Sequence, residues 1–166
     1  MTIPANKIVI MPTIFAEAGD EPIKALQKSG YEVVQNSFRR DLDEAEIVSL
    51  LDGAVAVIVG EEPISRGIIE QARHLKVISK LGVSVDNIDM DMARERGILV
   101  TRTPGAHQVS VAELTIALML GLARNVPRMD LDIRRKRWAQ PTGIEVMGKT
   151  LGIIGVGECG KEVAKR

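Results

Sequence analysis

Three glycines near the end of the sequence, at positions 155, 157 and 160, have a spacing that suits phosphate binding. They follow the apolar run Leu151–Ile154 and precede Lys161–Arg166, which reads as a helix start. In such a segment the first glycine permits a tight turn, the second lets the backbone approach a pyrophosphate, and the third lets helix and strand pack closely. Free N–H groups and the positive end of the helix dipole then face the phosphates. The spacing predicts a dinucleotide-binding loop made of Gly155, Val156, Gly157, Glu158, Cys159 and Gly160.

Glycines also gather in ordinary tight turns, so a purely structural turn is the alternative interpretation of this loop. The acidic residue that binds the ribose is expected about 20 residues further on, and a complete strand–helix–strand unit needs about 30 residues or more. The sequence ends at Arg166. We therefore expect only the opening of a nucleotide-binding domain here, in a chain that is a fragment, a truncated form or a cleavage product.

The composition is ordinary for a soluble globular protein, with 45% hydrophobic and 27% charged residues. Basic and acidic residues number 22 each and aromatic residues are 2%, so neither a polyanion nor stacked bases are indicated and no nucleic-acid partner is expected. We also expect no membrane association, because no signal peptide is evident and the apolar run Leu114–Ala123 is too short to span a bilayer.

Few side chains in this sequence are typical of metal or redox chemistry. Cys159 is the single cysteine, which excludes an internal disulfide and favours a reducing compartment, so a cytoplasmic location is expected. Within the glycine loop it reads as a small filler, with a reactive thiol at a helix start as the alternative. His74 reads as a solvated helix-end residue, and His107 as a loop residue, with a role at the border of a cleft as the alternative. With no cluster of metal ligands in the sequence, no metal site is expected.

The elements that position these residues begin with an alternation of short strands and helices over residues 1–103. Short apolar strands alternating with helices predict an α/β fold with a doubly wound parallel sheet, and five strands suit a flavodoxin-like order. Ligands of such sheets bind at the carboxyl ends of the strands. A capping box is expected before the second helix, with Asp41 as N-cap and Glu44 three residues later. The expected strands are Lys7–Met11, Tyr31–Gln35, Ala54–Val59, Val77–Lys80 and Ile98–Thr101, and the expected helices are Glu21–Lys28, Asp43–Leu51, Ser65–Ala72 and Asp89–Arg96.

Pro104-Gly105 breaks this alternation and reads as a hinge, so residues 104–166 are predicted to form interdomain helices and the start of a Rossmann nucleotide-binding domain. Ser110 and Glu113 have capping-box spacing before a strongly apolar helix, Val111–Arg124, which would need burial on two sides. Pro127 is expected to end or kink that helix. A second helix, Arg128–Trp138, and a strand at Leu151–Ile154 are expected to follow.

Four segments in this order resemble one known family, the D-isomer-specific 2-hydroxyacid dehydrogenases, including its D-3-phosphoglycerate dehydrogenase-like members. The resemblance covers the whole chain, most sharply from about Leu75, and implies an N-terminal piece of such an enzyme. In that family the flavodoxin-like part belongs to a discontinuous substrate domain, and a nucleotide-binding domain is inserted into it. The segments are Leu81-Gly82-Val83-Ser84-Val85-Asp86-Asn87-Ile88-Asp89, Gly97-Ile98-Leu99-Val100-Thr101-Arg102-Thr103-Pro104-Gly105, Ser110-Val111-Ala112-Glu113 and Gly148-Lys149-Thr150-Leu151-Gly152-Ile153-Ile154-Gly155-Val156-Gly157.

This resemblance implies hydride transfer between NAD(H) and a 2-hydroxy or 2-oxo acid, with NADP left open. Gly82, Val83 and Ser84 match the family loop whose backbone N–H groups hold the substrate carboxylate, an ordinary turn being the alternative. Val111 would lie near the nicotinamide. The catalytic arginine, glutamate and histidine of the family lie beyond the glycine loop, so no catalytic residue is assigned and the 166-residue chain alone is expected to be inactive. The full-length protein is expected to be a homodimer.

The sequence departs from the family pattern at several positions. Ser84 replaces a glycine, Arg102 stands where asparagine is frequent, and Glu158 puts a negative side chain in the phosphate loop. The segment Gly60-Glu61-Glu62-Pro63 lacks the arginine-serine pair that some phosphoglycerate dehydrogenases have there. This absence weakens the assignment of phosphoglycerate as the substrate but not the broader family resemblance. Asp86 and Asn87 read as turn and helix-cap residues. A non-catalytic binding or regulatory module, like the corepressors similar to these dehydrogenases, is the alternative function.

Overall fold

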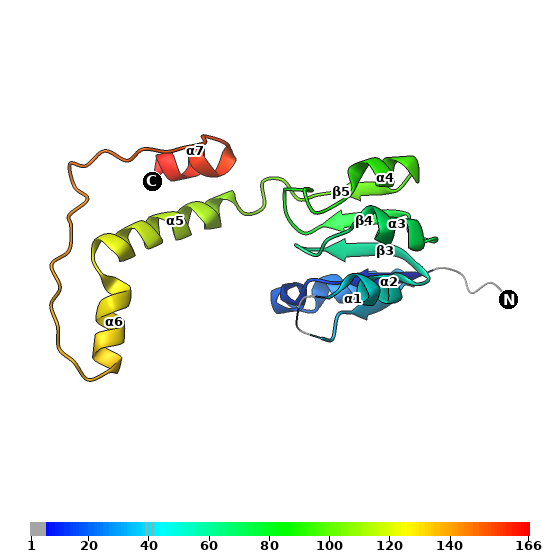
Figure 1. The fold of residues 1–166 in the computed structure, drawn as a ribbon, viewed down its shortest axis with the longest axis horizontal. Coiled ribbons are helices and arrows are strands. Elements are labelled where there is room, and N and C mark those ends of the chain that lie inside the picture. Colours follow the sequence, from blue (N-terminus) through cyan, green and yellow to red (C-terminus); the bar gives the residue numbers. More distant parts are fainter. Residues whose placement is uncertain (1–5, 39, 41) are drawn as a thin grey trace. The chain divides into compact units, whose positions relative to one another are not determined.

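The computed structural model describes residues 6–38, 40 and 42–166. The chain divides after Pro104 into two compact units, and each is described by itself below. Figure 1 shows the elements of both units in chain order.

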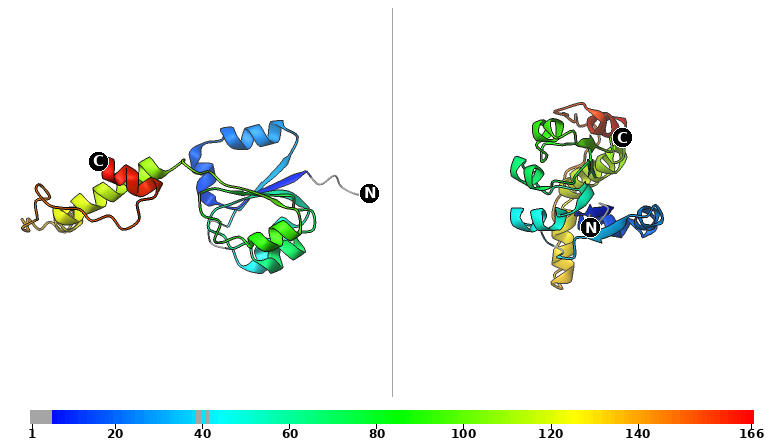
Figure 2. Two further views of the ribbon diagram at one scale, coloured as in Figure 1. Left: turned by 90° about the horizontal axis from the view of Figure 1, so that it is seen from above. Right: turned by 90° about the vertical axis from the view of Figure 1, so that its right-hand side faces the viewer.

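The first unit is built on a five-stranded sheet in which every neighbouring pair of strands is parallel. The strand order is β2-β1-β3-β4-β5, which confirms the predicted flavodoxin-like arrangement. Helix α1 lies on one face of the sheet, and α2, α3 and α4 lie on the other (Figure 2). The elements of this unit are β1 (Lys7–Ile10), the 3-10 helix η1 (Thr13–Ala18), α1 (Glu21–Lys28), β2 (Glu32–Gln35), α2 (Glu44–Leu51), β3 (Ala54–Val59), α3 (Arg66–Gln71), β4 (Val77–Lys80), α4 (Met90–Glu95) and β5 (Leu99–Thr101).

The main cluster of buried apolar side chains among the described residues lies within this unit. Val9, Val57 and Ile78 come from three adjacent strands and are fully buried. Ile47 of α2 and Ile68 of α3 pack against them in the same cluster. Strands covered on both faces must be apolar on both faces, which explains why β3 reads as the uninterrupted apolar run Ala54–Val59.

The starts of α2, α3 and α4 are fixed by side chains that accept backbone N–H groups, whereas the N-cap of α1, Asp20, makes no such hydrogen bond. The predicted N-cap Asp41 lies outside the described residues, and Asp43 is the residue that caps α2. Its carboxylate accepts the N–H of Glu46, whose own carboxylate accepts the N–H of Asp43, forming a capping box. The capping box therefore exists, but it lies two residues later than the predicted pair Asp41 and Glu44, and Asp43 has the extended backbone that an N-cap requires.

The second unit consists of three helices, α5 (Gln108–Ala123), α6 (Val126–Arg134) and α7 (Glu158–Lys165). Helix α7 lies alongside α5, and Arg166 reaches Glu113 at 3.4 Å (Figure 1). No single helix in the described part of the chain is both long and apolar enough to cross a membrane. Helices α5 and α6 reach that length and composition only together, and the chain bends by 66° between them.

The structure corrects three sequence predictions about this unit: the capping box at Ser110, the end of the first helix at Pro127 and the bounds of the second helix. Helix α5 begins at Gln108, with His107 as an N-cap that makes no side-chain hydrogen bond, so Ser110 lies inside the first turn and forms no capping box. Asn125 adopts a left-handed conformation that ends α5, and Pro127 sits in the first turn of α6, where its missing N–H costs nothing. Helix α6 therefore spans 126–134 and not 128–138.

The predicted strand at Leu151–Ile154 is also absent, since these residues have no strand partner in the described part of the chain. A strand exists only through hydrogen bonds to a neighbour, so an apolar run alone cannot form one. Leu151, Ile154 and Val156 are consequently exposed, and Ala112 is the buried apolar residue of α5.

Candidate functional site

The turn that follows β4 lies at the carboxyl edge of the parallel sheet and contains the predicted carboxylate-binding residues. Gly82 has φ +142°, a conformation that side chains with a Cβ rarely adopt. Its N–H donates to Oγ1 of Thr103 at 3.1 Å, and the same hydroxyl donates to the Gly82 carbonyl at 3.2 Å. The backbone N–H of Gly82 is thus already used within the protein, a contact that sequence reasoning did not anticipate.

The next two residues of the turn carry the donors that a ligand could use. Among the described residues, the amide N–H groups of Val83 and Ser84 have no hydrogen-bond partner. Two further hydrogen bonds stabilise this turn, one from the residue after β5 and one within the turn. Arg102 donates to the carbonyl of Val83 at 3.3 Å, and the hydroxyl of Ser84 accepts the N–H of Asp86 at 3.2 Å. Adjacent free backbone N–H groups at the ligand edge of a parallel sheet are suited to an anion such as a carboxylate.

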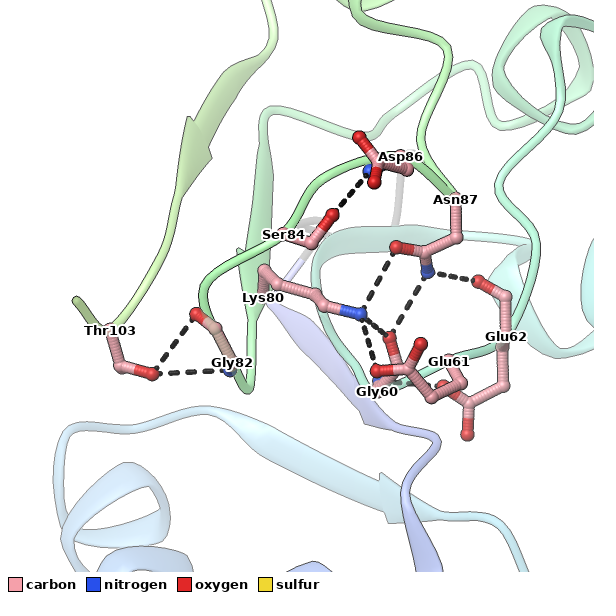
Figure 3. A network of polar contacts seen from close by, with 9 residues as sticks. All are labelled: Gly60, Glu61, Glu62, Lys80, Gly82, Ser84, Asp86, Asn87 and Thr103. Carbon is pink, nitrogen blue, oxygen red and sulfur yellow. Dashed lines mark hydrogen bonds and ion pairs between the residues drawn. The ribbon is translucent and has the colours of Figure 1, made fainter. Parts of the chain in front are cut away.

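A buried lysine lies directly beneath this turn, and the sequence analysis missed it (Figure 3). Lys80, the last residue of β4, is 2% exposed. Its ammonium group donates to the carbonyl of Gly60, to Oε1 of Glu61 at 2.9 Å and to Oδ1 of Asn87 at 3.0 Å. The available signal was a charged residue ending an otherwise apolar strand, which demands a partner.

Asp86 and Asn87 were predicted to be turn and helix-cap residues; both lie in a turn, but the side chain of Asn87 connects this turn to the turn after β3. Its amide donates to the carbonyls of Gly60 at 3.0 Å and Glu62 at 2.7 Å (Figure 3). The N-cap of α4 is instead Asp89, which accepts the N–H of Met92 at 2.8 Å. Asn87 cannot cap a helix that begins three residues later, because an N-cap directly precedes the first helical residue.

The turn after β3 brings two carboxylates to the same edge of the sheet. Glu62 accepts the N–H of Gly60 at 2.6 Å, whereas Glu61, the partner of Lys80, is 93% exposed along its side chain. No cationic side chain comes from residues 60–63. The positive charge of Lys80 is therefore neutralised within the protein, whereas Arg102, which directly follows β5, is a second cation at this edge, beside the Gly82 turn.

A hollow of about 640 Å³ opens at the carboxyl ends of β1 and β2. Its lining is mostly polar and includes Thr13, Glu17, Asn36 and Ser37. Sequence reasoning did not single out these residues. They follow strands at the same edge as the Gly82 turn, which agrees with the rule that ligands of parallel sheets bind at the carboxyl ends of strands.

The glycine loop lies in the second unit and has the backbone that its pattern predicts. Gly155 has φ +89°, and Gly157 is the N-cap of α7. A Cβ at Gly160 would overlap the carbonyl oxygen of Gly155, whereas one at Gly157 would meet nothing within 4 Å. The loop is therefore tightly folded at Gly160 and open at Gly157, where the first N–H groups of α7 have no partner within the helix. These residues fit the pyrophosphate of a dinucleotide.

The other predicted cofactor residues surround this loop or precede it. Val156 is exposed, and Cys159 is half-buried in the first turn of α7. Glu158 accepts a hydrogen bond from Lys161 at 2.9 Å, which raises the pKa of Lys161, so the negative charge of Glu158 is paired. Val111 lies near the start of α5 with 37% of its surface exposed. Among the described residues, no group of histidine, cysteine or acidic side chains is arranged to hold a metal ion.

Residues 11–157 match the catalytic domain of D-isomer specific 2-hydroxyacid dehydrogenases. The chain is 42% identical over 150 residues to the D-3-phosphoglycerate dehydrogenase of Methanocaldococcus jannaschii, covering 89% of this chain and 28% of that protein. It is 39% identical over 143 residues to the hydroxypyruvate reductase of Thermotoga maritima, covering 85% and 46%. A solved structure of a Thermus thermophilus protein has a TM-score of 0.85 and 34% identity, covering 96% and 51%. The chain thus spans about half or less of the length of these relatives.

Proposed function

The chain belongs to the D-isomer-specific 2-hydroxyacid dehydrogenase family, and from this premise we propose that the whole protein interconverts a small 2-hydroxy acid and its 2-oxo acid. The reaction is a hydride transfer between the C2 atom of that acid and a nicotinamide dinucleotide. The residues described above supply binding and orientation for both reactants.

The observation that carries this proposal is the turn after β4. Val83 and Ser84 present adjacent N–H groups that no described part of the chain binds, and Gly82 beside them is held by Thr103 in a conformation that favours glycine. In the proposed function these N–H groups bind the substrate carboxylate, which is the group that every 2-hydroxy and 2-oxo acid shares. Binding the carboxylate fixes the neighbouring C2 atom in one orientation.

The dinucleotide is proposed to bind at the second unit through its pyrophosphate. The N–H groups at the start of α7 would contact the phosphate oxygens, and Gly157 would allow their close approach. When bound, this cofactor supplies or accepts the hydride. We propose NAD as the cofactor on family grounds. Val111 is proposed to lie near the nicotinamide, in line with the resemblance.

The substrate is proposed to be small, but the relatives do not agree on its identity. One is a D-3-phosphoglycerate dehydrogenase and another a hydroxypyruvate reductase. The turn at residues 60–63 carries Glu61 and Glu62 and no cation. This particular turn therefore offers a phosphate group no cationic side chain, which favours a substrate without a phosphate group, such as hydroxypyruvate, over a phosphorylated one.

The direct test measures NADH oxidation by the purified full-length protein with hydroxypyruvate and other unphosphorylated 2-oxo acids, and NAD reduction with D-3-phosphoglycerate. We expect turnover with at least one 2-oxo acid and weaker turnover with the phosphorylated substrate. NADH binding without turnover on any substrate would contradict the proposal and favour the regulatory-module alternative. NADPH in parallel assays tests the cofactor preference.

Two further parts of the proposal concern the chain alone and its assembly. The 166-residue chain is proposed to be inactive, because the family's catalytic residues follow the glycine loop; turnover by this purified chain would contradict that. The full-length protein is proposed to be a homodimer. Leu114, Leu118 and Leu122 form an exposed apolar row along α5, which supports a contact with a second copy. Sedimentation of the full-length protein tests this.

A further inference from the structure

Lys80 is buried, and burying a charged side chain has an unfavourable desolvation free energy. A buried ammonium group loses its hydration, and apolar side chains stabilise such positions at least as well as ion pairs do. Here all three N–H bonds of the ammonium are used, by the carbonyl of Gly60 and by the side chains of Glu61 and Asn87. The acceptors lie in two different turns, so the ammonium joins segments that are 20 and 7 residues away from it in the sequence.

Asn87 completes the connection between the same two turns. Its side-chain NH2 group donates to the carbonyls of Gly60 and Glu62, while its backbone carbonyl accepts the N–H of Ile64 at 2.8 Å. A parallel bridge between Ile64 and Ile88 extends this pairing. The turn after β3 and the end of the turn after β4 are therefore one hydrogen-bonded body with Lys80 at its centre (Figure 3).

The Gly82 turn rests on this body. A Cβ at Gly82 would lie 3.3 Å from Cε of Lys80, so the lysine stem packs directly against the backbone of the turn. On the other side, Thr103 holds both backbone polar groups of Gly82. The turn is thus clamped between the lysine stem and Thr103, and the N–H groups of Val83 and Ser84 follow the clamped residue.

We propose that Lys80 and Asn87 are positioning residues that preorganise the Val83 and Ser84 N–H groups for the substrate carboxylate. The role assigned to the substrate rests on the proposed function, whereas the ordering of the turn does not. Removing the network leaves these donors in place but lets the turn sample other conformations. The binding geometry is then lost for part of the time.

The first arm of the test measures hydrogen exchange by mass spectrometry in the full-length protein, without substrate. Lys80→Met keeps an apolar stem of similar length and removes the ammonium group. We expect exchange to accelerate about tenfold or more in peptides covering residues 60–64 and 81–88, with β2 at 32–35 unchanged. Lys76→Met is the matched control, because Lys76 is exposed and directly precedes the first residue of the same strand.

The second arm measures steady-state kinetics with hydroxypyruvate and NADH. We expect Lys80→Met to raise the KM for the 2-oxo acid on the order of tenfold, with the KM for NADH changed less than about twofold. A merely structural lysine would not give this split between the two substrates. Asn87→Ala is expected to show the same pattern. If Lys80→Met does not fold, Asn87→Ala is used for both the hydrogen-exchange and the kinetic measurements.

The two arms separate this inference from the proposed function. If the wild-type protein reduces no 2-oxo acid, the proposed function is wrong, and exchange at 81–88 alone decides whether the network orders the turn. Unchanged exchange at 81–88 in a folded variant would overturn the inference. So would accelerated exchange with an unchanged KM for a substrate that the wild type turns over.

Discussion

At the scale of single residues, the two candidate sites depend on places where the backbone leaves no room for a side chain or requires an unusual conformation. Gly82 and the glycine loop are of this kind, and Lys80 is their polar counterpart. The side chains that surround them act mainly through hydrogen bonds to backbone groups. Substitutions at these positions are therefore expected to act on geometry before they act on charge.

Gly160→Ala is expected to weaken NADH binding on the order of tenfold in the full-length protein, because its Cβ would overlap the Gly155 carbonyl and push the loop open. A fluorescence titration with NADH measures the Kd. Gly152→Ala is the control, since a Cβ there would meet nothing within 4 Å. Equal affinities of the two variants would show that the close approach at Gly160 has no role in binding.

Glu46 is expected to contribute to acid stability. A hydrogen bond from Arg40, followed by the backbone N–H of Asp43, lowers its pKa from 4.5 to about 2. Because the folded-state pKa is depressed, this contribution is fully present above pH 4.5 and is lost as the pH falls toward 2.

Urea unfolding between pH 2 and pH 6 tests this linkage. Glu46→Gln should be less stable than the wild type at pH 6, and the difference should shrink steadily below about pH 4.5. Glu32→Gln serves as the control, because Glu32 is an exposed residue at the start of β2. A difference that is the same at every pH would mean that the Glu46 carboxylate has no stabilising charge interaction.

At the scale of elements, helices α3 and α4 start directly after the two turns that contain the Lys80 network and the proposed carboxylate-binding N–H groups. Ser65 and Asp89 cap α3 and α4 by accepting a backbone N–H three residues later. These caps set where the turns after β3 and β4 end. Cap identity could be read from the sequence only to within a few residues, because several Asp and Asn side chains in each turn are competent caps.

Asp89→Ala is expected to destabilise the protein by about 1 kcal/mol, since the N–H of Met92 loses its acceptor. Asp91→Ala, two residues further on, removes only an exposed pair with Arg94 and should cost no more than about 0.5 kcal/mol. Thermal or urea unfolding of both variants measures the difference. Similar losses in the two variants would contradict the cap assignment.

At the scale of the whole molecule, the two units are stabilised very differently. Among the described residues, the main cluster of buried apolar side chains lies between Val9 and Ile98. In the second unit, Ala112 and Asp132 are the buried residues, and many of its large apolar side chains are exposed. We therefore expect the first unit to bury enough apolar surface to fold alone, whereas the second unit buries too little.

Residues 1–104, produced alone, are expected to unfold cooperatively with a urea midpoint close to that of the 166-residue chain. Residues 105–166 alone are expected to show no cooperative transition, because they bury too little apolar surface. Circular dichroism during a urea titration measures both. Failure of residues 1–104 to fold would show that the core depends on the second unit.

Much of this fold could be predicted from local pattern. Apolar runs of four to six residues alternating with helices specify a parallel sheet, and the strands and helices of the first unit lie within a few residues of the predicted ranges. The glycine loop could also be predicted, because the spacing of its glycines reflects backbone constraints within six consecutive residues. The exception was Leu151–Ile154, where strand formation depends on a neighbouring strand that the pattern of the segment itself cannot supply.

The partners of the polar groups were decided only by the tertiary structure. Lys80 meets Gly60 and Glu61 because β3 and β4 are adjacent and in register, and Gly82 meets Thr103 because β4 pairs with β5. Their separations of 19 to 21 residues carry no periodic signal in the sequence. Periodicity reports which face of an element is buried, whereas a hydrogen bond between elements depends on register and side-chain reach. The family, the sheet order and the glycine loop were therefore determined by the sequence itself, and the network that holds the substrate turn emerged only from the packing of the strands.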